Sequence, residues 1–244
     1  MNILLIALFL ILQQAGTFKT EQKKNAHVKQ AYTDKEQVVT DTLAKYGITP
    51  SKANIFIRAF KNGDILEVWA KNKEDNTYQK VRTFPICASS GELGPKRMEG
   101  DYQVPEGFYH INHFNPFSNF YLSLGISYPN ESDKKLGVKG KLGGAIYIRG
   151  SCCTIGCIPI TDDYIKELYI YCVEAKNNGQ STIPVHVFPF RMDGDNWELV
   201  EKKFPDLKKH IDFWKNLQPG YKYFEENKKL PKITVAAEGK YVVG

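Results

Sequence analysis

One loop of the sequence, residues 150–157, combines three thiols with small residues that leave the backbone free to bend. It lies between an apolar run, 145–149, that predicts a strand and a helix expected from about Asp162, for which Thr161 or Asp162 is the expected cap. Cys157 follows Gly156 and precedes the N-terminus of that helix, where backbone freedom and the positive end of the helix dipole favour a thiolate. We therefore predict that Cys157 is a nucleophile and that Gly156 belongs to an oxyanion loop of N–H groups.

The residues of this region read Gly-Ser-Cys-x-x-x-Gly-Cys-x-Pro-x-Thr-Asp over 150–162. The run resembles the catalytic motif of the L,D-transpeptidase (YkuD-like) family, in the branch where a His-Gly pair stands shortly before the Gly-Cys pair. A second stretch, Gly-Asp-x-Gln-x-Pro-Glu-Gly-x-Tyr at 100–109, is similar to one that helps shape the substrate cleft in that family. A Phe-Pro-Phe-Arg-Met run at 188–192 is also similar, so the resemblance spans about 54–191.

The resemblance implies a cysteine acyl transferase that acts on peptidoglycan stem peptides. In such a reaction Cys157 attacks the bond between the third residue, an L-centred diamino acid, and the D-residue that follows it, and a thioester forms. An amine of another stem peptide or of a protein then accepts the acyl group; with water as acceptor the enzyme is an L,D-peptidase. We expect no cofactor, and we place Ser151 and Thr154 at the substrate cleft.

Arg149 occupies the position of the family's base histidine, eight residues before Cys157. A guanidinium stays protonated at ordinary pH and has no lone pair, so Arg149 cannot accept the thiol proton. It is suited instead to stabilising a thiolate or to binding a substrate carboxylate. Substitute bases to consider are His110 and His113, which are otherwise interpreted as surface or hydrogen-bonded side chains. His186 is a third, weaker candidate. The alternative function is a catalytically impaired homologue that binds the cell wall.

The chain has five cysteines, so at least one is unpaired whatever the bonding. A disulfide from Cys152 or Cys153 to another thiol is compatible with the sequence, which does not choose the partners. Cys87 and Cys172 are expected to be buried structural thiols. A third hypothesis makes the three loop thiols a zinc or redox site, but the only other pair of ligands with suitable spacing is two histidines. We therefore expect no metal.

Composition describes an ordinary globular protein, with 42% hydrophobic and 25% charged residues among 244. The net charge of +6 suits a negatively charged polymer such as cell wall. Lysines are scattered or form short pairs, and no arginine-rich stripe with interleaved aromatic residues is present. We therefore expect no nucleic-acid partner.

The N-terminus carries an uninterrupted apolar run at residues 3–12. Ten residues are too few for a stable membrane anchor, but they fit the apolar region of an export signal. We therefore expect a signal peptide at 1–16 and export to the periplasm or cell envelope. No stable membrane span is expected after cleavage.

The rest of the chain predicts a mainly β, α+β fold. After a solvated linker from residue 17, a capping box at 33–36 predicts a short helix, so that 17–53 is an N-terminal segment. Residues 54–191 are expected to form an L,D-transpeptidase-like mixed β-sheet sandwich with a helix after the nucleophile loop, and 192–244 a helical C-terminal extension that stops a helix at Pro219-Gly220. The expected strands are 54–60, 65–71, 78–88, 120–126 and 183–189.

Overall fold

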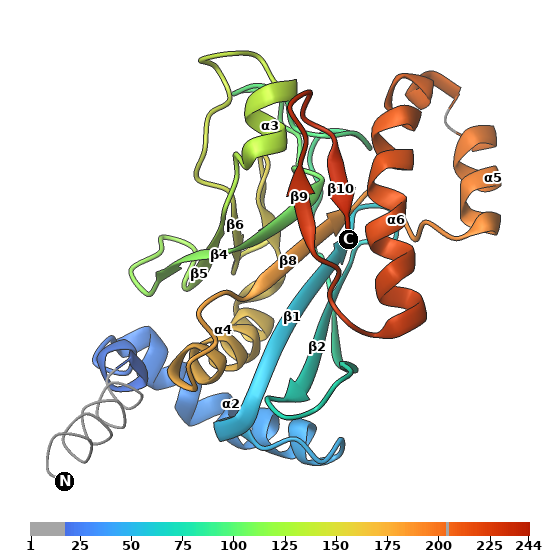
Figure 1. Ribbon diagram of the computed structural model, residues 1–244. Helices are drawn as coiled ribbons and strands as arrows, with labels where there is room; N and C mark the ends of the chain where they lie inside the picture. Colours follow the sequence, from blue (N-terminus) through green and yellow to red (C-terminus); the bar gives the residue numbers. More distant parts are fainter. Residues whose placement is uncertain (1–17, 204) are drawn as a thin grey trace, which may run out of the picture.

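A single eight-stranded mixed sheet organises the protein (Figure 1). The structure is a computed structural model that describes residues 18–203 and 205–244, and the predicted signal peptide lies outside them. In sheet order the strands are β3 (Gln79–Pro85), β2 (Ile65–Asn72), β1 (Ala53–Phe60), β8 (Pro184–Phe188), β4 (Gly107–Asn115), β5 (Ser123–Ile126), β6 (Tyr147–Arg149) and β7 (Ile158–Pro159). The α+β class predicted from the sequence is confirmed.

Helices cover both faces of this sheet (Figure 1). They are α2 (Ala26–Ala44), α3 (Glu131–Leu136), α4 (Thr161–Asn177), α5 (Gly194–Lys203) and α6 (Ile211–Asn227), with short 3₁₀ turns at Pro50–Lys52 and Pro205–His210. A small antiparallel hairpin, β9 (Ile233–Val235) and β10 (Tyr241–Val243), follows α6. Within the described ranges, no helix is both long and apolar enough to cross a membrane.

Alternation along β1 explains why two layers pack on it. Ile55 and Ile57 join the core formed with α2 and α4, whereas Phe56 and Phe60 pack toward α6. Successive side chains of a strand point to opposite faces, so a central strand covered on both faces becomes apolar at nearly every position. The predicted strands at 54–60 and 65–71 reflect this pattern.

Helix α4 follows residues 150–157, which we call the thiol loop, as predicted, but its N-terminus differs from the prediction. Asp162 does not cap it: Asp162 Oδ1 accepts a hydrogen bond of 2.7 Å from the Ser151 N–H. Thr161 is the first residue of α4 and has a φ of +71°. Ile160, at the N-cap position, makes no side-chain hydrogen bond to the helix. The expected capping role of Thr161 or Asp162 is therefore wrong, because the carboxylate fixes the thiol loop instead. Cys172 is fully buried in α4, as predicted.

The N-terminal segment differs from its prediction. Helix α2 starts at Ala26, where Asn25 Oδ1 accepts from the His27 N–H at 2.8 Å. Residues 26–32 were expected to be a linker, yet Val28 and Tyr32 are buried. Packing of α2 on α4, where Tyr32 OH donates to Glu174 at 2.8 Å, stabilises two extra turns, so tertiary packing outweighs the local capping signal at 33–36.

The C-terminal segment also departs from its prediction at one point. Helix α6 runs through Pro219 and Gly220 to Asn227, so the expected stop is wrong. Gly220 lies close against the ring of Phe108, because a Cβ at Gly220 would stand 2.6 Å from Phe108 Cζ. Tyr221 and Phe224, just beyond the pair, are buried. Their packing keeps the helix continuous despite the proline.

Candidate active site

The thiol loop connects two parallel neighbouring strands, β6 and β7, in which Ile148 pairs with Ile158. Cys157 stands directly before β7 as a free, partly exposed cysteine. Its Sγ lies 3.9 Å from the carbonyl oxygen of Ala145. A small cavity at the end of β1 is lined by Cys157 together with Ala59, Lys61, Ile86, Ala88, Ser89, Val104, Ile158 and Val187.

Thr154 and Gly156 shape the backbone on which Cys157 stands. The Thr154 hydroxyl donates to the carbonyl oxygen of Cys157 at 2.8 Å and accepts from the Gly156 N–H at 3.1 Å. Gly156 has a φ of +137°, and a Cβ there would lie 3.2 Å from the Gln103 carbonyl oxygen. Glycine therefore fits both the backbone angle and the close approach. The Gly156 N–H, which was predicted to belong to an oxyanion loop, is bonded to the Thr154 hydroxyl in this structure.

Arg149 binds the loop backbone. Its side chain is buried and donates to the carbonyl oxygen of Gly150 at 2.9 Å and to that of Cys153. The guanidinium carbon stands 3.6 Å from the ring centre of Phe120. Nη1 and Nη2 are thus bonded to loop carbonyl oxygens, whereas the buried Nε has no partner among the described residues, so in this structure Arg149 holds the loop in place.

The sulfur nearest to Arg149 belongs to Cys153. Arg149 Nη2 and Ser151 Oγ each lie 3.9 Å from Cys153 Sγ. Cys153 is exposed and free, and the interactions with Ser151 and then Arg149 lower its pKa below the ordinary thiol value. Ser151 and Arg149 are thus gathered around Cys153 at one end of the loop, and Thr154 supports Cys157 at the other.

The three histidines considered as substitute bases lie elsewhere. His186 is enclosed by aromatic rings, and burial, with the nearby Arg58 charge, lowers its pKa to about 3. Its neighbour Val187 lines the Cys157 cavity, so His186 points to the opposite face of the sheet. His110 is exposed on β4 and lines a different cavity from Cys157.

His113 shares the sheet face of Tyr147, whose ring centre is 6.3 Å from that of His113. Strands β5 and β6 separate β4, which carries His113, from β7. Three inter-strand spacings of about 4.8 Å separate the backbone of β4 from that of β7 by roughly 14 Å, so His113 is not on a strand adjacent to Cys157. None of the three imidazoles makes a recorded contact with Cys157 within the described residues.

A disulfide joins Cys87 to Cys152 across 65 positions of the sequence. Cys87, which was expected to be a buried structural thiol, is half-buried and bonded, and it is the partner that the sequence left open for Cys152. The bond ties the segment after β3 to the thiol loop, and the Cys87 N–H also donates to the Pro159 carbonyl oxygen at 3.0 Å. Because Cys152 is bonded, the three-thiol zinc site of the third hypothesis loses one of its ligands.

A buried carboxylate that the sequence analysis did not single out supports the segment facing the loop. Glu106 accepts from the Gly94 N–H at 2.7 Å and from Trp214 Nε1 at 2.8 Å, and pairs with Lys61 Nζ at 3.0 Å. Lys61 also donates to the carbonyl oxygens of Gly94 and Val104. The Gly-Asp-x-Gln-x-Pro-Glu stretch was recognised as a motif, but its sequence does not indicate that Glu106 would form a buried ion pair with the distant Lys61.

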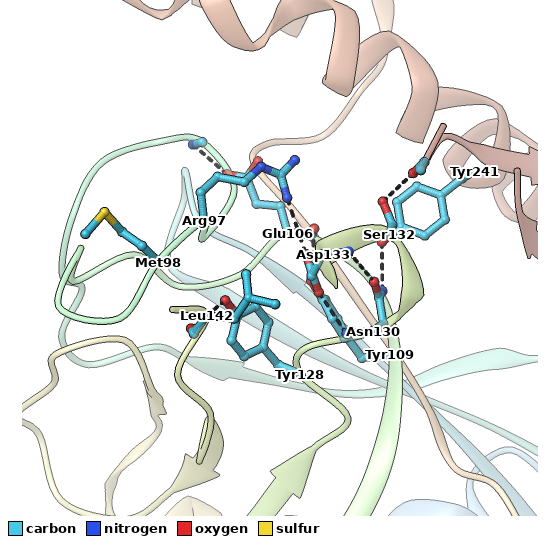
Figure 2. A network of polar contacts seen from close by, with 12 residues as sticks. Arg97, Met98, Glu106, Tyr109, Tyr128, Asn130, Ser132, Asp133, Leu142 and Tyr241 are labelled. Atoms are coloured by element: carbon cyan, nitrogen blue, oxygen red, sulfur yellow. Dashed lines mark hydrogen bonds and ion pairs between the residues drawn. The ribbon is translucent and has the colours of Figure 1, made fainter. Parts of the chain in front are cut away.

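Figure 2 shows a second network, at the base of α3. Asp133 accepts from Tyr109 OH at 3.0 Å and from the Asn130 N–H at 3.1 Å, and it pairs with Arg97 Nη1 at 3.4 Å. Burial raises the pKa of Asp133 to about 6, although these partners favour its charged form. Through Arg97, α3 is fixed to the 94–106 segment that approaches Gly156.

The sequence of this chain is similar to that of known proteins. The sequence model of the YkuD family, the L,D-transpeptidase catalytic domain, matches residues 55–187. A protein of Escherichia coli strain K12 named "Putative L,D-transpeptidase YafK" is 37% identical over 191 residues, which cover 78% of this chain and 73% of that protein.

Two solved structures are also similar. The helical cell shape determining protein Pgp2 of Campylobacter jejuni has a TM-score of 0.46 and 19% identity, with 80% of this chain and 78% of that chain covered. Bd1075 of Bdellovibrio bacteriovorus has a TM-score of 0.42 and 21% identity, with 77% and 79% covered. From the family match over residues 55–187 and the 37% identity to YafK, we conclude that this chain belongs to the L,D-transpeptidase catalytic domain family.

Proposed function

We propose that this protein is a cysteine acyl transferase of the cell wall that uses Cys157 as its nucleophile. Membership of the family supports a peptidoglycan-related function of the transpeptidase type. The observation that carries the finer proposal is the Cys157 thiol itself, which is free, partly exposed and held at a cavity by the Thr154 hydrogen bonds. The N-terminal apolar run and the positive net charge are consistent with a place in the cell envelope.

In the proposed reaction the Cys157 sulfur attacks a carbonyl carbon of a stem peptide. The thiol proton leaves to solvent, the C–N bond breaks, and the departing amine takes up a proton. A thioester to Cys157 remains, which an amine of a second stem peptide or of a protein resolves by transpeptidation, or water by hydrolysis. Among the described residues, none of His110, His113 and His186 contacts Cys157. In this proposal the thiol therefore loses its proton to water, and the ionised fraction of Cys157 limits the first step.

A second candidate is a homologue that binds peptidoglycan without turning it over. Arg149 favours it, because a positioned general base contributes roughly 10²–10⁴-fold to a rate and Arg149 cannot supply one. The two candidates differ in whether the natural chain forms a thioester at all.

Arg149→His separates the candidates. We expect natural protein to convert disaccharide-tetrapeptide slowly and Arg149→His to raise the rate at least about tenfold, since an imidazole at 149 would act as a base. Products are separated by liquid chromatography and identified by mass, which also distinguishes transfer from hydrolysis. Arg149→Lys is the matched control, because it keeps a cation without adding a base.

The outcomes are distinct. Turnover in the natural chain supports the enzyme, and turnover only in Arg149→His supports the binding homologue. If neither protein acts on stem peptides of any length while both keep their folded circular dichroism, the proposed acyl transfer is wrong. A rate in Arg149→Lys equal to that of Arg149→His would show that the histidine is not acting as a base.

A further inference from the structure

A second cavity, which we call the distal cavity, has a volume of about 380 Å³ and lies away from the thiol loop. Its floor is the β4–β8 pair, where Phe108 is opposite His186, and its wall includes Ile233 and Val235 of β9. Phe108 and His186 point to the sheet face opposite that of Val187, which lines the Cys157 cavity. The two cavities share no lining residue.

His186 is an unsatisfied polar group in this cavity. The side chain is only 5% exposed, lines the cavity and is packed edge to face against Phe56 and Phe108. Its Nδ1 is completely enclosed and has no hydrogen-bond partner in the described part of the chain. Leaving such a buried atom unpaired is destabilising, so an imidazole is kept where phenylalanine would pack at lower cost. The other ring nitrogen, Nε2, is not enclosed and likewise has no hydrogen-bond partner in the described part of the chain. A ligand in the cavity can therefore meet the ring at Nε2.

The state of the ring defines the group that it would meet. Because burial keeps His186 neutral, one ring nitrogen donates a hydrogen bond and the other accepts one. A hydroxyl or a secondary amide can pair with Nε2 whether that nitrogen donates or accepts, whereas a carboxylate can only accept. Glu131 at the rim of the cavity also disfavours an anionic ligand.

The remaining lining favours a ring with one apolar face and a polar edge. Phe108 and Tyr241 stand edge to face with ring centres 4.8 Å apart. Asn130 Nδ2 donates to Tyr241 OH at 2.8 Å and thereby fixes that ring, as the dashed lines of Figure 2 show. Thr182 adds a hydroxyl at the rim. Aromatic faces with a few placed polar groups are the usual makeup of a small-molecule site.

We propose that the distal cavity binds a neutral N-acetylated sugar, with an acetamido or hydroxyl group at His186 and the ring against Phe108 and Tyr241. The acetamido methyl would meet the apolar side of the cavity at Ile233 and Val235. If the protein acts on peptidoglycan as proposed, this site would hold it on the glycan strand while the thiol loop meets the peptides. Binding itself requires nothing of Cys157.

The test titrates the whole protein, and in parallel Cys157→Ser, with N,N′-diacetylchitobiose in a calorimeter. We expect saturable binding in the millimolar range or tighter by both proteins, and at least tenfold weaker binding of cellobiose, which lacks the acetamido groups. No heat of binding up to 10 mM sugar, or equal binding of cellobiose, would overturn the proposal. Binding by Cys157→Ser is independent of acyl transfer, so failure of the proposed function leaves this result readable.

Two variants locate the sugar. His186→Phe keeps an aromatic ring in the cluster, and we expect it to lose at least tenfold in affinity, whereas His113→Phe outside the distal cavity is the matched control and should bind as the natural chain does. Val235→Trp should block the cavity even if His186→Phe unfolds, and thermal denaturation reports folding of each. Unchanged affinity in folded His186→Phe or Val235→Trp would place the sugar elsewhere and contradict the proposal.

Discussion

Arg149, the last residue of β6, binds the backbone of the loop that follows it. It donates to the backbone of Gly150 and Cys153 and lies against Phe120, so its positive charge is used inside the loop. The sequence correctly excludes a base at this position, since a guanidinium has no free lone pair. The sequence does not show that two carbonyl oxygens of the loop that follows Arg149 would accept hydrogen bonds from its Nη1 and Nη2.

Thr154 is the residue whose loss should affect Cys157 most directly without touching the sulfur. Thr154→Val removes the bond to the Cys157 carbonyl oxygen and leaves the Gly156 N–H unpaired. We expect the free energy of unfolding to fall by about 1–3 kcal/mol and acylation of Cys157 to slow. Urea denaturation and acylation kinetics measure the two effects.

Thr154→Ser is the control for this prediction, because it keeps the hydroxyl and removes only a methyl group. It should resemble the natural chain in both measurements. If Thr154→Val and Thr154→Ser behave alike, the two hydrogen bonds do not hold the loop.

At the scale of elements, the disulfide from Cys87 to Cys152 joins the end of the β3 region to the thiol loop. A cross-link that closes a loop of 65 positions stabilises the folded state by roughly 4 kcal/mol in the chain-entropy account. We expect the double variant Cys87→Ser with Cys152→Ser to lower the free energy of unfolding by about 2–4 kcal/mol. Guanidinium denaturation of the oxidised proteins measures the difference.

Cys153→Ser is the matched control, since its thiol is adjacent in sequence, exposed and free. It should leave stability within about 0.5 kcal/mol of the natural value. Peptide mapping without reductant should find Cys87 linked to Cys152. A map that links Cys152 or Cys87 to Cys157 would contradict this pairing and would also remove the candidate nucleophile.

The elements also show what a sequence can and cannot predict. The strands β1 and β2 can be predicted because their short runs are rich in β-branched and aromatic residues. The thiol loop can be predicted from its Gly-Cys pair. The start of α2 at Ala26 and the continuation of α6 past Pro219 depend on burial against other elements. The partner of Cys87 and the ion pair of Glu106 join distant parts of the chain, so local patterns carry no information about them.

Across the whole molecule, Glu67 joins strands of the sheet to the segment that follows β8. It pairs with Arg58 at 2.8 Å and with Arg191 at 2.6 Å, and Trp69 Nε1 donates to it at 2.9 Å. Burial alone would raise the pKa of Glu67, but the Arg58 charge and these hydrogen bonds overcome burial and lower it to about 2.

A lowered carboxyl pKa makes stability depend on pH in a defined window. The Glu67 contribution, roughly 3 kcal/mol, should be complete above about pH 4.5 and be lost as the pH falls through about 2. Glu67→Gln should be less stable at pH 7 and should show a shallower loss between pH 4.5 and 2. Chemical denaturation at several pH values measures this, with the exposed Glu74→Gln as control. A slope in Glu67→Gln equal to that of the control would contradict the assignment.

The central claim is that Cys157 forms a thioester with a peptidoglycan stem peptide. The most direct test incubates the protein with disaccharide-tetrapeptide, quenches it in acid, and maps the adduct by mass spectrometry. We predict an acyl adduct on Cys157, which is absent in Cys157→Ser and present in Cys153→Ser. An adduct on Cys153 alone, or none in either the natural chain or Arg149→His, would contradict the account.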